Sequence, residues 1–575
     1  MKSFALTQKD FYKTDHKSQY PEGTNKVYSN LTPRSDKLFK GSSLWDKKLV
    51  TFGIQKVIKE FLLDEFNESF FKQPKEKACA RYKRRLDTSL GPDAVKIDHV
   101  EALWDLGFLP IRIKAIPEGS RVNMRVPVWT ITNTLDAFYW LTNDLETVTS
   151  CETWKMATVA TIAYEYRRLL DKYAEETGTP REFVQFQGHD FSMRGMSNRF
   201  DAASCGMGHA LSFTGTDTIC AIDAVEDYYN GNSELELIGT SVPATEHSVM
   251  CMGGQLSEID TFRRLINDVY PCGIVSIVSD TWNFWRVVTE YMTELKDEIL
   301  ARPANAIGLS KVVIRPDSGN PIDIICGSVD VVDMTKHDSF EYVQQWMAEI
   351  LLERVESETA HGDRGESTKD GYFKWNSQIY KITIEIEWNR YDKQFYYVDG
   401  HTMTSCEVVT LTPEQKGALQ CLWEVFGGTT TDKGYRMLDS HIGLIYGDSI
   451  TIERCEAILA RMKKMGFASG NVVFGIGSYT YQYMTRDTFG MAIKATYGEI
   501  NGVPQEIEKN PITDSGIKKS ACGLLRVEKE GDDYVLYDRQ TPEQEQQGEL
   551  RTIFEDGKLL IDESFATIRA RLGAL

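Results

Sequence analysis

The stretch KVVIRPDSGNP, residues 311–321, joins a buried strand to a charged loop. Residues 312–314 form a short β-branched run, which is typical of a strand buried on both faces. Arg315 and Asp317 follow at once, in a loop that also contains glycine and proline. Charged side chains at the end of a buried strand are costly unless they bind something, and α/β proteins bind ligands at this end of their strands.

Six other loops repeat this pattern of an apolar segment followed by polar residues. They are HDFSMRG from His189, FTGTDT from Phe213, SVPATEHS from Ser241, IVSDTWN from Ile277, IYGDS from Ile445 and FGIGSYT from Phe474. Most recur about every 30 residues, which is the length of one strand, one helix and two loops. Seven such units predict an α/β fold with an irregular (β/α) barrel-like domain whose loops meet at one rim.

This barrel-like domain is predicted to span residues 156–495. It begins with a long amphipathic helix over residues 156–178, which ends at a glycine. Residues 1–155 are expected to be α+β and residues 496–575 β-rich, and the two parts are expected to pack together as a second domain.

The regular spacing is interrupted between Arg315 and Asp448, where 133 positions stand in place of one or two units. ITIEIEW and QFYYV alternate there as strands, and Asp399-Gly400 suits a turn. Residues 355–410 are therefore predicted to be an inserted β element.

Composition limits the possible partners and the cellular setting. The chain has 575 residues, 42% hydrophobic and 26% charged, with a net charge of -19, which argues against nucleic acid or an acidic membrane as the main partner. Its eleven cysteines are scattered without a C-x-x-C pair, and no apolar run reaches the length of a membrane span. We expect a cytoplasmic protein with reduced thiols.

Each loop alone is weak evidence of chemistry: His247 could be an ordinary loop histidine, and Asp280 could cap a helix. Together the loops place arginines, carboxylates, a histidine and a glycine turn at one rim. Carboxylates and arginines suit a Mg²⁺-bound diphosphate, a glycine turn before a helix suits a second phosphate, and Phe191 offers a face for a flat ring. A ligand with these three parts indicates phosphoribosyl transfer.

The chain resembles the nicotinamide phosphoribosyltransferase family of type II phosphoribosyltransferases. Several of the quoted motifs occur in the order seen in that family, together with KDFYKTDHKSQYP and FGIGSYTYQYMTRD. The resemblance covers nearly the whole chain outside the insertion. The resemblance implies synthesis of nicotinamide mononucleotide and diphosphate from nicotinamide and 5-phosphoribosyl 1-diphosphate. It also implies Mg²⁺, coupling to ATP hydrolysis through a phosphohistidine, and a homodimer with active sites at the subunit interface.

The resemblance implies a role for each motif residue on the base side of the site. Phe191 would stack on nicotinamide, and Tyr12, with Asp10 in the same N-terminal arm, would reach the other face from the partner subunit. Asp217 would accept a hydrogen bond from the carboxamide. Arg315 would lie between the base and the diphosphate.

On the ribose side, Asp280 and Asp317 would hold Mg²⁺–diphosphate and ribose hydroxyls. Asp448, with Gly447, would contact the ribose as well. The 5′-phosphate would be bound by Gly477, Ser478, Arg486 and Arg194. In GIGSYT, serine and tyrosine stand where the family usually has glycines.

His247 would accept the phosphoryl group from ATP. The neighbouring carboxylate of Glu246 could hold the imidazole tautomer so that the other ring nitrogen attacks.

Asp217 favours nicotinamide over nicotinate on physical grounds. Its carboxylate accepts from an amide N–H, whereas burying it against the carboxylate of nicotinate costs several kcal/mol. Two alternatives remain at this point: a nicotinate phosphoribosyltransferase, and an inactive binding or signalling homologue that retains the pocket.

Overall fold

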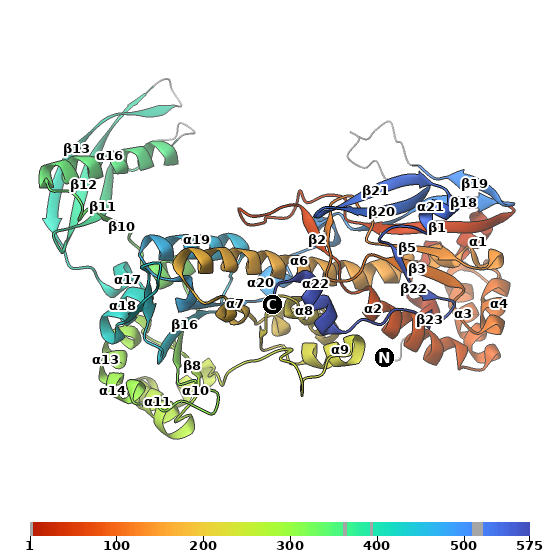
Figure 1. Cartoon of the computed structure of the whole chain (residues 1–575), viewed down its shortest axis with the longest axis horizontal. Coiled ribbons are helices and arrows are strands. Elements are labelled where there is room, and N and C mark those ends of the chain that lie inside the picture. The colour runs from red at the N-terminus through yellow and green to blue at the C-terminus, as the bar shows by residue number, and fades with distance from the viewer. Residues whose placement is uncertain (1–3, 360–364, 391–394, 509–520) are drawn as a thin grey trace.

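The computed structural model describes residues 4–359, 365–390, 395–508 and 521–575. The molecule is elongated, and the helix α6 (Glu146–Thr177) runs along its long axis from an antiparallel sheet to a parallel one (Figure 1). The helix predicted over residues 156–178 is thus confirmed, although it begins earlier. It ends at Gly178, whose φ of 76° suits glycine.

The parallel sheet has six strands, and neighbouring strands all run in the same direction. Most of its apolar side chains are buried. Val313 of β9 is only partly buried, so the run at 312–314 is fully buried on one face and not on both as predicted. In spatial order the strands are β7 (Gly215–Thr216), β6 (Gly188–Asp190), β17 (Val472–Ile476), β16 (Ile442–Tyr446), β9 (Val312–Arg315) and β8 (Val275–Val278).

Residues 240–244 connect the two edges of this sheet. Thr240 forms a parallel bridge with Gly215 of β7, and Ala244 forms one with Ser276 of β8. Taken in chain order, the six strands and this bridging segment follow one another around a ring, which closes where β17 pairs with β6. The seven repeated units of the sequence correspond to these seven segments.

Helices precede or follow most of the parallel strands along the chain, and α14 (Lys296–Leu300) is the last of those between β8 and β9; the others named here lie before, between or after the remaining strands. They are α7 (Arg181–Gln187), α8 (Arg199–Ala210), α9 (Cys220–Tyr229), α11 (Glu258–Arg264), α15 (Pro321–Cys326), α18 (Ala418–Phe426) and α19 (Ile452–Lys464). The helix α8 packs closely against α6 at Gly208, where a Cβ atom would lie 3.1 Å from the backbone nitrogen of Ala160. A side chain at this position would force the two backbones slightly apart.

Strands from both ends of the chain form one seven-stranded sheet at the other end of α6 (Figure 1). The helices α3 (Lys75–Leu90) and α4 (Asp98–Leu106) share its hydrophobic core. The strand order is β19 (Val503–Glu506), β18 (Ala492–Ile500), β1 (Thr24–Thr32), β5 (Trp129–Asn133), β3 (Ile111–Ala115), β22 (Arg551–Glu555) and β23 (Lys558–Leu559).

The two sheets are tied together by the C-terminal helix α22 (Phe565–Leu572). The guanidinium group of Arg569 donates hydrogen bonds to the carbonyl groups of Ala210, Leu237 and Ile238. A buried arginine with three carbonyl acceptors fixes the C-terminal part against the segments next to β7.

The insertion is larger than the sequence indicated. It projects from the end of the molecule far from the antiparallel sheet (Figure 1) and has a core of its own. The predicted β element at 355–410 is in fact a four-stranded sheet covered by one helix. It consists of β10 (Val331–Asp333), α16 (Phe340–Glu358), β11 (Thr368–Trp375), β12 (Gln378–Arg390) and β13 (Tyr396–Val408).

The prediction of a turn at Asp399-Gly400 is wrong. Both residues lie within β13, where Gly400 pairs with Glu387. The connection between β12 and β13 falls on residues 391–394, outside the described segments. Within those segments, no helix combines the length and apolarity needed to cross a membrane.

Candidate functional site

The polar loops gather where the parallel strands end. Because all these strands point the same way, their carboxyl ends lie at one rim of the sheet. The loops after β6, β7, β8, β9, β16 and β17, with the segment after Thr240, contribute the residues described below.

Asp217 follows β7, and two side chains of the rim orient its carboxylate. His189 Nε2 lies 3.0 Å from Asp217 Oδ1, and Ser241 Oγ donates to the same oxygen at 2.5 Å. Burial acts to raise the pKa of Asp217, but these hydrogen bonds and the charge of Arg315 outweigh it and hold the pKa below its ordinary value. Asp217 is therefore a fixed, ionised acceptor.

Phe191 lies beside His189, the histidine that contacts this carboxylate, and against two glycines of the neighbouring loops. Its ring centroid is 4.7 Å from that of His189. A Cβ atom on Gly475 would lie 2.4 Å from Phe191 Cδ2, and one on Gly447 would lie 3.3 Å from the same atom. These glycines leave room for the ring, so both have a packing role.

The carboxylate of Asp280 links three loops. His247 Nε2 lies 3.2 Å from its Oδ1, while Oδ2 accepts hydrogen bonds from the backbone N–H of Asp317 at 3.0 Å and from Ser318 Oγ at 2.6 Å. The sequence suggested Glu246 as the partner of His247. That suggestion is wrong, because Glu246 instead accepts a hydrogen bond from Ser248.

Asp317 and Asp448 complete a cluster of carboxylates with Asp280. Burial raises the pKa of Asp317, and the negative charges of Asp280 and Asp448 raise it further. Burial and the same three carboxylates also raise the pKa of Tyr446, whose hydroxyl donates to the carbonyl of Gly319 at 2.8 Å. A carboxylate whose pKa is raised by neighbouring negative charges, as that of Asp317 is, favours a bound cation.

Within the described residues, no group of three or more histidine, cysteine or acidic side chains is arranged to hold a metal ion. Mg²⁺ commonly binds through one or two carboxylates together with water and substrate phosphates. Asp280 and Asp317 fit that mode, with substrate oxygens completing the coordination.

Arg315 does not pair with Asp317, its neighbour in the same loop. Its Nη2 atom donates to the carbonyl of Thr245, and its Nε atom has no hydrogen-bond partner in the described part of the chain. Arg315 therefore keeps donor capacity for an anion at the rim.

The loop after β17 carries the glycine turn, followed by α20 (Ser478–Tyr481). This helix is a single turn, so it offers backbone N–H groups but only a small dipole. Gly195 lies against it, since a Cβ atom there would come 2.0 Å from Ser478 Oγ. The neighbouring Arg194 is exposed, as is Arg486 on the short helix η11 (Arg486–Thr488).

Tyr12 and Asp10 do not join this rim within one chain. Thr147 Oγ1 donates to Asp10 Oδ2 at 2.9 Å, and the Tyr12 side chain is 65% exposed. Both precede α1 (His16–Gln19), which lies beside the antiparallel sheet at the opposite end of the molecule from β8 and β16 (Figure 1).

Sequence reasoning gave no role to His189, Ser241 or Ser318. Each stands in a quoted loop, HDFSMRG, SVPATEHS or IRPDSGNP. Their position in the loops was the available signal, but the carboxylate that each side chain meets comes from another loop.

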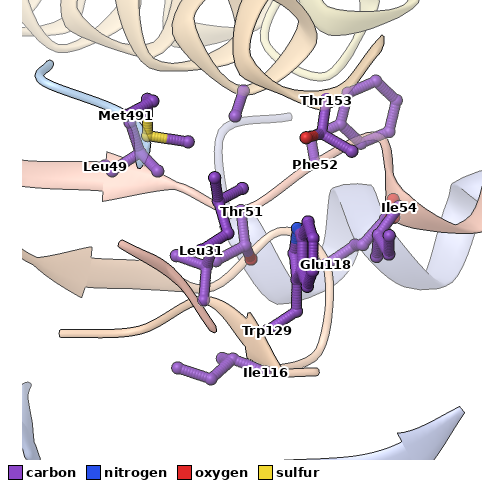
Figure 2. Close-up of a pocket in the computed structure, with 12 residues that line it drawn as sticks. Leu31, Leu49, Thr51, Phe52, Ile54, Ile116, Glu118, Trp129, Thr153 and Met491 are labelled. Atoms are coloured by element: carbon purple, nitrogen blue, oxygen red, sulfur yellow. The ribbon is translucent and has the colours of Figure 1, made fainter. Parts of the chain in front are cut away.

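A small enclosed cavity lies elsewhere, between α6 and the antiparallel sheet (Figure 2). Its volume is about 10 Å³, room for roughly one water molecule. Glu118 lines it and accepts a hydrogen bond from the backbone N–H of Gln55 at 2.9 Å, and burial raises the pKa of Glu118 to about 7. The cavity is too small for an organic substrate.

The fold and the rim together define an α/β enzyme that transfers a phosphorylated sugar, since carboxylates for a cation, arginines for phosphate and an aromatic platform converge at the carboxyl ends of parallel strands. The profile of the nicotinate phosphoribosyltransferase (NAPRTase) family matches residues 186–359 and 372–558. The chain belongs to this family and is a phosphoribosyltransferase.

Curated relatives match nearly the full length. A protein of Acinetobacter baylyi named nicotinamide phosphoribosyltransferase is 51% identical over 563 residues, 98% of this chain and 96% of the relative. One of Mycoplasma pneumoniae with the same name is 29% identical, covering 88% and 92%. The solved structure of human nicotinic acid phosphoribosyltransferase has a TM-score of 0.45 at 13% identity, covering 98% and 93%.

The contact between Gly475 and Phe191 yields a test. We expect Gly475→Ala to lower kcat/KM for phosphoribosyl transfer about tenfold or more, because the added methyl group must displace the Phe191 ring. Steady-state kinetics measures this. Gly400→Ala in β13 is the control and should leave kcat/KM unchanged; a Gly475→Ala enzyme with wild-type kcat/KM would contradict the packing role.

Proposed function

We propose that the chain is a nicotinamide phosphoribosyltransferase. It transfers the phosphoribosyl group of 5-phosphoribosyl 1-diphosphate to nicotinamide, giving nicotinamide mononucleotide and diphosphate in NAD biosynthesis or salvage. The observation that carries this proposal is the Asp217 carboxylate, held by His189 and Ser241 beside Phe191. The names of the two bacterial relatives support it.

Asp217 selects the amide over the acid. Since His189 and Ser241 both donate to Oδ1, the other oxygen is available to accept an N–H of the carboxamide. The lowered pKa of Asp217 keeps the carboxylate ionised at neutral pH, so nicotinate would bring a second negative charge against it. This disfavours the alternative, a nicotinate phosphoribosyltransferase.

The remaining rim residues act on the sugar and its phosphates. Arg315 stabilises the departing diphosphate, and Asp280 and Asp317 hold Mg²⁺, which when bound neutralises diphosphate charge. Asp448 and Gly447 contact the ribose. The 5′-phosphate binds to Gly477, Ser478, Arg194 and Arg486.

Phe191 sets the angle at which the pyridine ring approaches. With the carboxamide fixed by Asp217, the ring nitrogen faces the anomeric carbon. The bond from that carbon to the diphosphate oxygen breaks and the bond to nitrogen forms, in a substitution that is largely dissociative.

ATP hydrolysis is coupled through His247. Asp280 Oδ1 accepts a hydrogen bond from the Nε2–H group of His247, which leaves the lone pair of Nδ1 available. Nδ1 attacks the γ-phosphorus of ATP, the P–N bond forms, and ADP leaves. Because Asp280 also holds the loop of Asp317, the phosphorylation state of His247 bears directly on the diphosphate site.

The enzyme is proposed to be a homodimer in which Tyr12 and Asp10 of the partner subunit reach the site. Exposed apolar side chains near the rim support this, among them Phe200 at 61% and Ile219 at 71%. The eleven cysteines are all free, which supports a cytoplasmic setting.

Asp217→Ala tests the base assignment. We expect kcat/KM for nicotinamide to fall roughly 10- to 100-fold, because the carboxamide loses its acceptor, while KM for 5-phosphoribosyl 1-diphosphate changes little. Discrimination against nicotinate should narrow as well. Asp399→Ala in the insertion is the control, and an equal loss for both substrates would refute the assignment.

His247→Ala tests the ATP coupling. The variant should retain slow basal synthesis of nicotinamide mononucleotide but lose the stimulation by ATP, because no phosphoryl acceptor remains. Product formation with and without ATP measures this. Glu246→Gln should keep the stimulation, since Glu246 does not contact His247; ATP stimulation that survives in His247→Ala would rule out the phosphohistidine.

A further inference from the structure

A second histidine, His209, is buried beneath the rim and is not part of the site described above. It lies on α8 and is inaccessible to solvent. His209 Nδ1 is 2.7 Å from the hydroxyl of Tyr481, and Nε2 is 3.0 Å from the carbonyl oxygen of Gly215. Both ring nitrogens therefore have a partner, one on α20 and the other on β7.

The partners fix the tautomer of His209. A carbonyl oxygen can only accept, so Nε2 carries the proton, and Nδ1 accepts from the Tyr481 hydroxyl. Burial lowers the pKa of His209, against the opposing effect of the Asp190 charge and the Gly215 carbonyl. The neutral ring thus holds one donor and one acceptor in a fixed geometry.

One end of this connection supports the base side of the rim. Gly215 packs beneath His189, because a Cβ atom there would lie 2.8 Å from His189 Nδ1. His189 in turn donates to Asp217, which stands two residues after Gly215. A shift of the Gly215 carbonyl would therefore move both His189 and Asp217.

The other end supports the phosphate side. Tyr481 is the last residue of α20, whose first residue is Ser478. Tyr481 is fully buried, and its backbone N–H donates to the carbonyl of Gly477 at 3.2 Å. Moving the Tyr481 ring would therefore shift the turn that carries Gly477 and Ser478.

We propose that His209 and Tyr481 are positioning residues that hold the nicotinamide subsite and the 5′-phosphate subsite at a fixed separation. This rests on the proposed function for the assignment of the two subsites. The transfer needs the ring nitrogen and the anomeric carbon aligned, and small displacements of reacting groups are costly. A hydrogen-bonded histidine between the two subsites supplies that constraint from below, without touching either substrate.

Two substitutions of His209 each remove one of its two hydrogen bonds and can keep the other. His209→Gln places an amide near the position of Nε2, so it can keep the bond to Gly215 and lose that to Tyr481; His209→Asn does the reverse. We expect His209→Gln and Tyr481→Phe to raise KM for 5-phosphoribosyl 1-diphosphate about tenfold. We expect His209→Asn to raise KM for nicotinamide by about the same factor.

A double variant adds a readout that a purely structural role would not give. If the two side chains act through one bond, His209→Gln combined with Tyr481→Phe should raise KM for 5-phosphoribosyl 1-diphosphate no further than either alone. Tyr28→Phe removes a buried tyrosine hydroxyl from β1 and is the matched control, with both KM values unchanged.

Asp217→Ala and Arg486→Ala serve as references for the two subsites in the same assay. The positioning role is overturned if Asp217→Ala and Arg486→Ala raise KM for their own substrates while the His209 and Tyr481 variants leave both KM values unchanged or raise both equally. The proposed function stands in that case. If Asp217→Ala and Arg486→Ala do not raise KM for their own substrates, the assignment of the two subsites is wrong, and so is this inference. If each variant raises KM for its expected substrate alone, the result supports both the positioning role and the proposed function.

Discussion

Strand β9 is hydrogen-bonded to a parallel strand on each side, and this pairing decides where the charges of the rim lie. Ile314 pairs with Ile277 of β8 and with Leu444 of β16. Since the three strands are in fixed register, the residues that follow them meet: Asp280 after β8, Asp317 after β9 and Asp448 after β16. The bond from Asp317 N–H to Asp280 is a consequence of that register.

The remainder of the molecule supports this parallel sheet. The helix α6 spans from it to the antiparallel sheet, and Arg569 ties the C-terminal helix to the segments around β7. Beneath the rim, His209 joins β7 to α20. The insertion has its own core and projects away, so the register of the parallel strands does not depend on it.

Local sequence patterns predicted the parts of the fold that depend on local chemistry. The β-branched run at 312–314 is strand β9, although Val313 is partly exposed, so only one face is fully buried. The long helix and its terminal glycine were also predictable. The size of the insertion was not, because the sequence of α16 does not show which sheet the helix packs on. Only its contacts with β11 and β12 show that it belongs to the insertion.

The candidate site also has parts that the sequence predicted and parts that it did not. Loop positions predicted which residues meet at the rim, because parallel strands end together. Sequence proximity wrongly suggested Glu246 as the partner of His247, whereas Asp280, 33 residues away, holds it. His209 gave no signal, since a buried histidine in a helix has no motif. Tyr12 precedes α1, which lies at the opposite end of the molecule from β8 and β16 (Figure 1).

The central claim is that the Asp217 carboxylate, fixed by His189 and Ser241, makes this rim a site for nicotinamide. The most direct measurement supplies the enzyme and Mg²⁺ with 5-phosphoribosyl 1-diphosphate and equal amounts of nicotinamide and nicotinate, and separates the products by chromatography. We expect nicotinamide mononucleotide with little nicotinate mononucleotide. A predominance of nicotinate mononucleotide would contradict this claim.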